Sequence, residues 1–152
     1  MWSWEQRTGR LLLNHNLVGI GYSGADDDNK DDPDDAKNNP ELQAQKNVGP
    51  IPRGRYRIGA PFNHQLRGPY CLRLDPLPGT ETFGRDGFLI HGDSIRAPGT
   101  ASHGCIILAR AHRVAIWESG DRVMEVVEGG LTIRFGDEGS ELGLRNPAIE
   151  TA

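Results

Sequence analysis

The chain has 152 residues, enough for one domain with a hydrophobic core and too few for two. Its 20 glycines and 10 prolines predict many turns and therefore a β-rich fold. The formal net charge of -4, with no basic stripe, argues against a nucleic-acid partner, and no apolar run approaches the ~20 residues of a membrane span.

The N-terminal segment "SWEQRTGRLLLNHNLVGIGYSG" is typical of short strands joined by tight turns. Thr8-Gly9 and Asn14-His15-Asn16 interrupt the apolar runs, which predicts successive hairpins. The start of the chain lacks the basic and then apolar order of a secretory signal peptide. We therefore expect the protein to be made in the cytoplasm and to leave it by another route.

A block of like charge follows these strands. The residues "DDDNKDDPDD", Asp26–Asp35, cannot be buried together, and we expect a solvated, mobile loop. The next stretch is irregular, with one helical turn predicted at Glu41–Lys46.

Alternating polar and apolar residues predict two half-buried strands in the middle of the chain. In "GRYRIGAPF" Tyr56 and Ile58 alternate with arginines, and "YCLRLDPL" places Tyr70, Leu72 and Leu74 on one face. The short apolar run "GFLIHG" predicts a central strand that ends at His91.

The pattern changes period after Cys105. The segment "ILARAHRVAIWESG" predicts a short amphipathic helix ended by Gly120. "DRVMEVVEGG" and "LTIRF" predict two strands joined at Gly129-Gly130, and a loosely attached tail is expected over 136–152. Without a repeat or a second core, residues 1–152 form one predicted domain.

The segment "FLIHGDSIRAPGTASHGCIIL" concentrates the reactive side chains. A thiol attacks an acyl carbon as the thiolate, so a catalytic cysteine needs a base or a positive charge beside it. A strand would deliver His91, and a loop returning through Pro98-Gly99 would present Cys105. Gly104 permits close backbone approach, and the amides of Gly104 and Cys105 are candidate donors to an oxyanion.

Other roles for these residues stay open. Cys71 and Cys105 are either inert core thiols or a disulfide pair, because the distance between their Cα atoms decides pairing. A second alternative is a zinc site, although the spacing of its ligands matches no paired-ligand pattern. Its ligands would be His91, His103, Cys105 and His112.

The motifs "HGDS" and "SHGC" together resemble the signature of the L,D-transpeptidase (YkuD-like) family. The resemblance implies a β-sandwich or barrel, with Cys105 as the acylated nucleophile and His91 as its base. It implies no metal and no cofactor. It also implies that four residues line the substrate and oxyanion site: Gly92, Ser102, His103 and Gly104.

The resemblance extends over about Gly49 to Val127, because "GPIPRGRYRI" is similar to the family's Pro-x-Gly-x-Tyr strand. One departure concerns the position two residues after the cysteine. The family commonly has Arg or Asn there, whereas this chain has Ile107. Arg96 or Arg110 is the candidate that would bind the substrate carboxylate instead.

The compact stretch between His91 and His103, with "WSWEQRTGRL", "GYSG", "KNNP" and "GPIPRG", resembles a branch of type VI secretion effectors. That resemblance implies an antibacterial enzyme acting on peptidoglycan stem tetrapeptides in the periplasm of target bacteria. Through a cysteine acyl-enzyme it would remove or exchange the terminal D-alanine, with the acceptor left open. The implied partners are peptidoglycan stem peptides, the type VI secretion machinery and a cognate immunity protein.

Three rival interpretations remain. A papain-like cell-wall amidase usually has its cysteine before its histidine, the reverse of the order here, although catalytic groups recur in every order. A non-catalytic β module that binds cell wall or a partner protein would leave Cys105 inert. A housekeeping cell-wall L,D-transpeptidase would use the same residues without the effector role.

Overall fold

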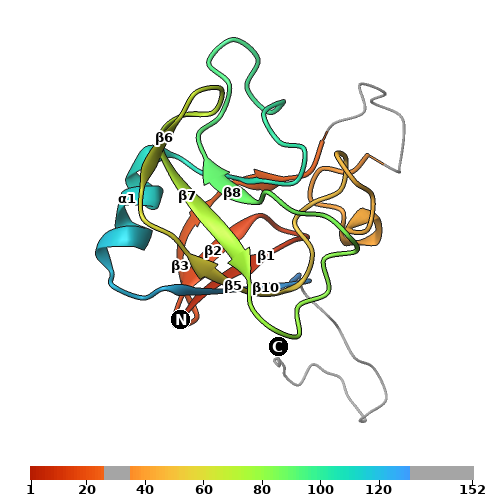
Figure 1. The fold of residues 1–152 in the computed structure, drawn as a ribbon, viewed down its shortest axis with the longest axis horizontal. Helices are drawn as coiled ribbons and strands as arrows, with labels where there is room; N and C mark the ends of the chain where they lie inside the picture. Colours follow the sequence, from red (N-terminus) through yellow and green to blue (C-terminus); the bar gives the residue numbers. More distant parts are fainter. Residues whose placement is uncertain (26–34, 131–152) are drawn as a thin grey trace, which may run out of the picture.

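The computed structural model of the protein describes residues 1–25 and 35–130. These residues form a mainly β structure in which ten strands make one continuous sheet, as the composition predicted (Figure 1). The strands are β1 (Trp2–Glu5), β2 (Arg10–Leu13), β3 (Asn16–Ile20), β4 (Tyr22–Ser23), β5 (Gly54–Ile58), β6 (Phe62–His64), β7 (Gly68–Pro76), β8 (Leu89–His91), β9 (Ile106–Ile107) and β10 (Val123–Val127).

The sheet brings the two ends of the described chain together. Its strand order is β3-β2-β1-β10-β5-β7-β8-β9-β4, with β6 paired to β7 outside this path. The predicted N-terminal hairpins are confirmed, and their first strand, β1, runs parallel to β10, with Trp2 beside Met124. The turns fall at Gly9 and at Asn14 and His15, which all have positive φ angles.

The core lies against the inner face of this sheet. Alternation in β1 buries Trp2 and Trp4, and alternation in β5 buries Tyr56 and Ile58, as the pattern of β5 predicted. Tyr56 meets Phe88 edge-on, with ring centroids 5.8 Å apart.

Strands β8 and β9 form the part of the sheet that positions the reactive residues. All three residues of β8 are buried, and β8 lies between β7 and β9. It pairs with β9 in parallel, with Ile90 beside Ile106 and His91 beside Ile107. The long loop between these two strands projects at the top of Figure 1.

The predicted helix follows β9. It is α1 (Arg110–Glu118), which contacts β7 and β8. Ser119 is its C-terminal cap, and Gly120 follows with a φ angle of 80°. The helical turn predicted at Glu41–Lys46 lies earlier, as the 3₁₀ turn η1 (Pro40–Leu42), because Asn39 caps the backbone amide of Glu41.

Several predictions fall on residues that the structure does not describe. The acidic block lies outside the described residues except for Asp35, and the predicted strand "LTIRF" and the tail over 136–152 lie outside them entirely. In the described ranges no helix is long and apolar enough to cross a membrane.

Candidate active site

The backbone fixes the orientation of the His91 ring. His91 ends β8 with only 2% of its surface exposed, and its Nδ1 lies 2.8 Å from the carbonyl oxygen of Gly92. A carbonyl oxygen can only accept, so Nδ1 carries the ring proton and Nε2 carries the lone pair in the neutral ring. Among the described residues, this buried Nε2 has no hydrogen-bond partner. The Nε2 lone pair of the neutral ring is therefore not bound to any donor of the described residues, and it can accept a proton.

The register of the sheet places the reactive residues on one face. His91 lies beside Ile107 in the parallel pair of β8 and β9. Side chains alternate along a strand, so Cys105, two residues before Ile107, projects from the same face as His91. Cys71 also belongs to this face by alternation, since its neighbour Leu72 pairs with Ile90, the neighbour of His91. Both thiols are free, and no hydrogen bond joins Cys105 to His91 in this structure.

Ser102 shapes the turn that presents Cys105. It is buried, and its hydroxyl donates to the carbonyl oxygen of Cys105 at 2.6 Å. The same hydroxyl oxygen accepts from the amides of Gly24 at 2.9 Å and Gly104 at 3.1 Å. The Gly104 amide is thus bound to Ser102 in this structure.

Arg85 lies beneath this turn, where its guanidinium stacks over the Phe88 ring and donates hydrogen bonds to backbone oxygens. Its side chain is 5% exposed and donates to the carbonyls of Gly49 at 2.8 Å, Pro50 at 2.9 Å and Gln43, and more weakly to that of His103 at 3.5 Å. These bonds join the segment before β5 to the turn that carries the cysteine. Every hydrogen-bond partner is neutral, so no carboxylate among these partners offsets the guanidinium charge beside the site.

Gly104 is required by this packing. Its φ angle is +136°, and a Cβ atom there would lie 2.5 Å from Nη2 of Arg85. Any other residue would be strained at this φ angle and would displace the guanidinium.

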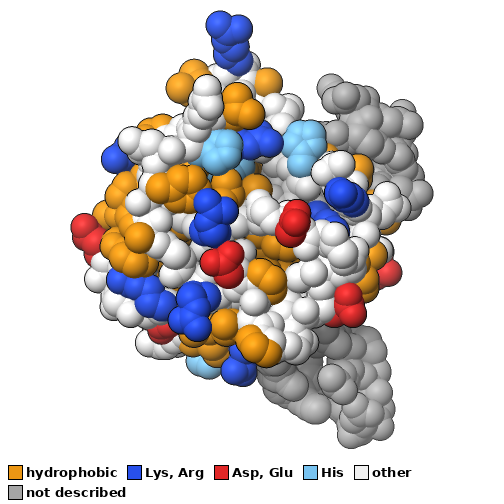
Figure 2. Space-filling model, in the orientation of Figure 1, with side chains coloured by type: hydrophobic (Ala, Val, Ile, Leu, Met, Phe, Trp, Pro, Cys, Tyr) orange, Lys and Arg blue, Asp and Glu red, His pale blue; other side chains and the backbone are white. Residues whose placement is uncertain are grey.

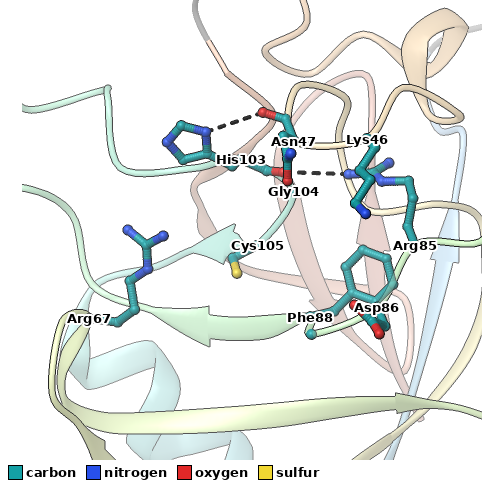
Figure 3. A pocket seen from close by; sticks show the side chains of 10 residues that line it. Lys46, Asn47, Arg67, Arg85, Asp86, Phe88, His103, Gly104 and Cys105 are labelled. Carbon is teal, nitrogen blue, oxygen red and sulfur yellow. Dashed lines mark hydrogen bonds between the residues drawn. The ribbon is translucent and has the colours of Figure 1, made fainter.

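A cavity of about 180 Å³ opens beside Cys105. In Figure 3 Cys105 lies between Arg67 on one side and Lys46 and Arg85 on the other. His103 lines the cavity, and its Nδ1 contacts the carbonyl oxygen of Asn47 at 3.2 Å. Figure 2 shows lysine and arginine side chains beside two histidines on the upper part of the face that it displays. The cavity is suited to an anionic ligand.

Burial keeps both candidate reacting groups neutral at rest. Burial lowers the pKa of His91, and the nearby charges of Arg67 and Arg113 act in the same direction, against the hydrogen bond to Gly92. Burial raises the pKa of the Cys105 thiol, although the Leu89 amide and the charge of Arg67 oppose that effect. The site therefore holds a thiol and a neutral imidazole, an arrangement suited to general-base activation.

The arginines expected to bind a carboxylate lie away from the cavity beside Cys105. Arg110 stacks over the Tyr70 ring at 5.3 Å and lines a second cavity of about 410 Å³. Arg96 lines a third cavity of about 420 Å³, which it shares with Arg67 and Arg113.

The residues considered for zinc are dispersed. The His112 ring packs against Gly19 of β3, and the His103 ring contacts Asn47. In the described part of the chain, no group of three or more His, Cys, Asp or Glu side chains is placed to hold a metal ion.

The cations of the Cys105 cavity were not found from the sequence. Arg67 and Lys46 are solvent-exposed residues in turns, and Arg85 follows "ETFG" with no motif around it. One signal was present: Arg85 is a charged residue beside the apolar run that leads into β8, where burial of its side chain was to be expected.

The sequence also matches a known protein family. Residues 20–128 match the Tlde1 domain, a span that contains every candidate site residue. No curated protein matches the chain. With the match covering most of its length, the chain belongs to the Tlde1 domain family, a family of type VI secretion L,D-transpeptidase effectors.

Proposed function

We propose that this protein is a cysteine enzyme that acts on peptidoglycan stem tetrapeptides as an L,D-carboxypeptidase or L,D-transpeptidase, with Cys105 as nucleophile and His91 as base. The observation that carries the proposal is the His91 ring, whose Nδ1 is bound to Gly92 and whose unpartnered Nε2 lies on the same sheet face as Cys105. Membership in an effector family favours an antibacterial role over cell-wall maintenance.

The first half-reaction forms a thioester. Nε2 of His91 accepts the Cys105 thiol proton while the sulfur bonds to the carbonyl carbon of the third stem residue, a diaminopimelate. The resulting oxyanion accepts hydrogen bonds from backbone amides. Because the Gly104 amide is held by Ser102, we assign the oxyanion to the Cys105 amide. The carbon–nitrogen bond then breaks, and the His91 proton passes to the departing amine of D-alanine.

The second half-reaction releases the acyl group. An acceptor enters where D-alanine left, His91 takes a proton from it, and its oxygen or nitrogen attacks the thioester carbon. The Cys105 sulfur leaves and recovers its proton from His91. Water as acceptor gives a shortened stem, a D-amino acid gives exchange, and the amine of a second stem gives a cross-link.

The remaining polar residues of the site support this chemistry. Gly92 orients the base through its carbonyl oxygen, Ser102 fixes the cysteine turn, and His103 lines the substrate cavity. As an effector, the protein would be delivered by the type VI secretion machinery to the periplasm of a target cell. A cognate immunity protein would protect the producing cell there.

Incubation of the purified protein with tetrapeptide muropeptides, followed by mass spectrometry, tests the proposal. We expect loss of the D-alanine mass, or its replacement by an added D-amino acid. Cys105→Ala and His91→Ala should both abolish the change, because base and nucleophile act as a unit and their losses do not add.

Cys71→Ala is the matched control, since Cys71 is a buried thiol on the same face and should be dispensable for turnover. If the Cys71→Ala protein is inactive and Cys105→Ala is active, the nucleophile has been assigned to the wrong residue. Normal turnover in His91→Ala would instead transfer the base role to His103.

A further inference from the structure

The turn between β6 and β7 holds an arginine at the edge of the candidate site. Arg67 lies at the tip of this turn, directly before Gly68, which has a φ angle of 93°. The Nδ1 atom of His64 accepts hydrogen bonds from the backbone amides of Leu66 and Arg67, each at 3.0 Å. The backbone beneath the Arg67 side chain is therefore fixed although the residue itself is exposed.

The Arg67 charge acts on both reacting groups. Arg67 lines the cavity beside Cys105 (Figure 3), and its charge lowers the pKa of Cys105 and that of His91. Within the described residues its guanidinium has no hydrogen-bond or ion-pair partner. An unpaired guanidinium beside a nucleophile and its base is available to an anionic ligand.

The other charged groups of the cavity are placed differently. Arg85 is committed to backbone carbonyls, and in Figure 3 Lys46 lies across Cys105 from Arg67. Lys46 shares the cavity with Asp86, so its end of the cavity carries both signs of charge. Ile107, two residues after the cysteine, is 3% exposed and offers no polar group.

We propose that Arg67 binds the C-terminal carboxylate of the stem peptide, on the leaving-group side of the scissile bond. This inference rests on the proposed function. In a tetrapeptide that carboxylate belongs to the residue whose amine departs, and His91 protonates that amine. A cation that acts on both Cys105 and His91 is therefore on the correct side of the bond.

This assignment predicts a substrate preference. A tetrapeptide places its carboxylate one carbon beyond the scissile nitrogen, within reach of Arg67. A pentapeptide places the carboxylate one residue farther away and puts an uncharged peptide group there. Arg67 would thus favour tetrapeptides over pentapeptides through a charge-assisted hydrogen bond.

Alkylation of Cys105 tests the cation without any peptidoglycan. Iodoacetate and iodoacetamide carry the same reacting carbon, but only iodoacetate carries a carboxylate. The ratio of their rate constants at Cys105, in the Cys71→Ala background, should fall about tenfold in Arg67→Ala and remain close to wild type in Arg67→Lys. Arg57→Ala, which removes an exposed arginine of β5 outside the cavity, should leave the ratio unchanged. An unchanged ratio in Arg67→Ala would overturn the assignment.

A pair of substrates tests the carboxylate directly. Wild-type kcat/KM should be about 10- to 100-fold higher for a tetrapeptide acid than for the same peptide ending in D-alaninamide, the range expected of a hydrogen bond between charged groups. Arg67→Ala should turn over both at similar rates. If the wild type turns over both peptides at equal rates and turnover depends on Cys105, the role of Arg67 is refuted and the proposed function stands. If neither peptide is turned over, the proposed function fails, and the alkylation ratio still decides whether Arg67 binds carboxylates.

Discussion

A single hydrogen bond between neighbouring residues sets the chemistry of His91. With Nδ1 bound to Gly92, the lone pair is confined to Nε2, and burial keeps the ring neutral. The arrangement has a cost, because a buried neutral histidine must remain unprotonated where the unfolded chain would bind a proton. The neutral state of His91, which the proposed catalysis needs, is therefore coupled to the free energy of unfolding of the chain.

We predict that His91 makes the protein less stable in mild acid. The unfolded chain protonates this histidine near pH 6.5, whereas the folded pKa is lower. Below this pH the unfolded state binds more protons than the folded state. The free energy of unfolding is therefore not reduced by His91 above about pH 7. It falls as the pH drops through 6.5 toward the folded pKa, by up to about 1.4 kcal/mol per pH unit.

Urea denaturation at pH 7 and pH 5 measures this effect. His91→Gln should lose less stability than wild type between the two pH values. His15→Gln, at an exposed turn between β2 and β3, serves as the control and should behave like wild type. An identical loss in wild type and His91→Gln would show that other groups carry the pH dependence.

At the residue scale, the site residues that belong to a sequence motif could be predicted. Those that reach the site only through folding could not. His91 and Cys105 stand out because they belong to the motifs "HGDS" and "SHGC". Arg67 comes from a turn about 25 residues before His91, and only the pairing of β7 with β8 brings it to the site. The engagement of the Gly104 amide by Ser102 likewise depends on a turn geometry that spacing does not reveal.

The turn that carries Cys105 and the arginine beneath it form one unit at the scale of elements. Arg85 joins the segment before β5 to this turn through carbonyl oxygens alone. Loss of the guanidinium leaves several buried carbonyls without donors, a situation that is costly in proteins.

We predict that Gly104 and Arg85 are energetically coupled. Arg85→Met should lower the free energy of unfolding by about 2 to 4 kcal/mol. Gly104→Ala should also destabilise the fold, because its Cβ would lie 2.5 Å from the guanidinium and its φ angle is +136°. In the double variant the cost of Gly104→Ala should be smaller, since the clash with the guanidinium is gone while the backbone strain remains.

Denaturant titration of the four proteins gives this coupling energy. Gly120→Ala is a suitable comparison, because Gly120 also has a positive φ angle but has open space around its Cβ direction. Its cost should not change in the Arg85→Met background. Additive effects of Gly104→Ala and Arg85→Met would mean that the turn relaxes away from the arginine.

Local elements were largely predictable, and their arrangement was not. Alternation identified β5 and β7, and the change of period identified α1, because each pattern reports which side of an element is buried. No pattern within a strand reports its neighbour, so the parallel pairings of β1 with β10 and of β8 with β9 could not be read from the sequence. The turn at Glu41–Lys46 was misplaced because the Asn39 cap precedes a proline that starts the turn earlier.

At the scale of the whole molecule, the proposed activity should be harmful only where stem peptides are exposed. Expression in the cytoplasm of a susceptible bacterium should be tolerated. Expression with a fused secretory signal peptide should slow growth or cause lysis, because the enzyme would then meet the cell wall. Growth curves and viable counts with and without the signal peptide measure the difference.

Cys105→Ala should remove this toxicity while Cys71→Ala retains it, and a periplasmic immunity protein should relieve it by blocking the cavity. Equal toxicity in both compartments would count against a cell-wall target. Killing by the Cys105→Ala protein would favour a non-catalytic binding module.

The parallel pairing of β1 with β10 also affects how the chain folds during synthesis. Trp2 and Trp4 are buried, yet the strand that covers their edge, Val123–Val127, leaves the ribosome more than a hundred residues later. Contacts of such long range are slow to form, and they leave apolar surface exposed in the meantime. The nascent chain should therefore be prone to aggregation until β10 emerges, and its yield should depend on chaperones that shield the first hairpin.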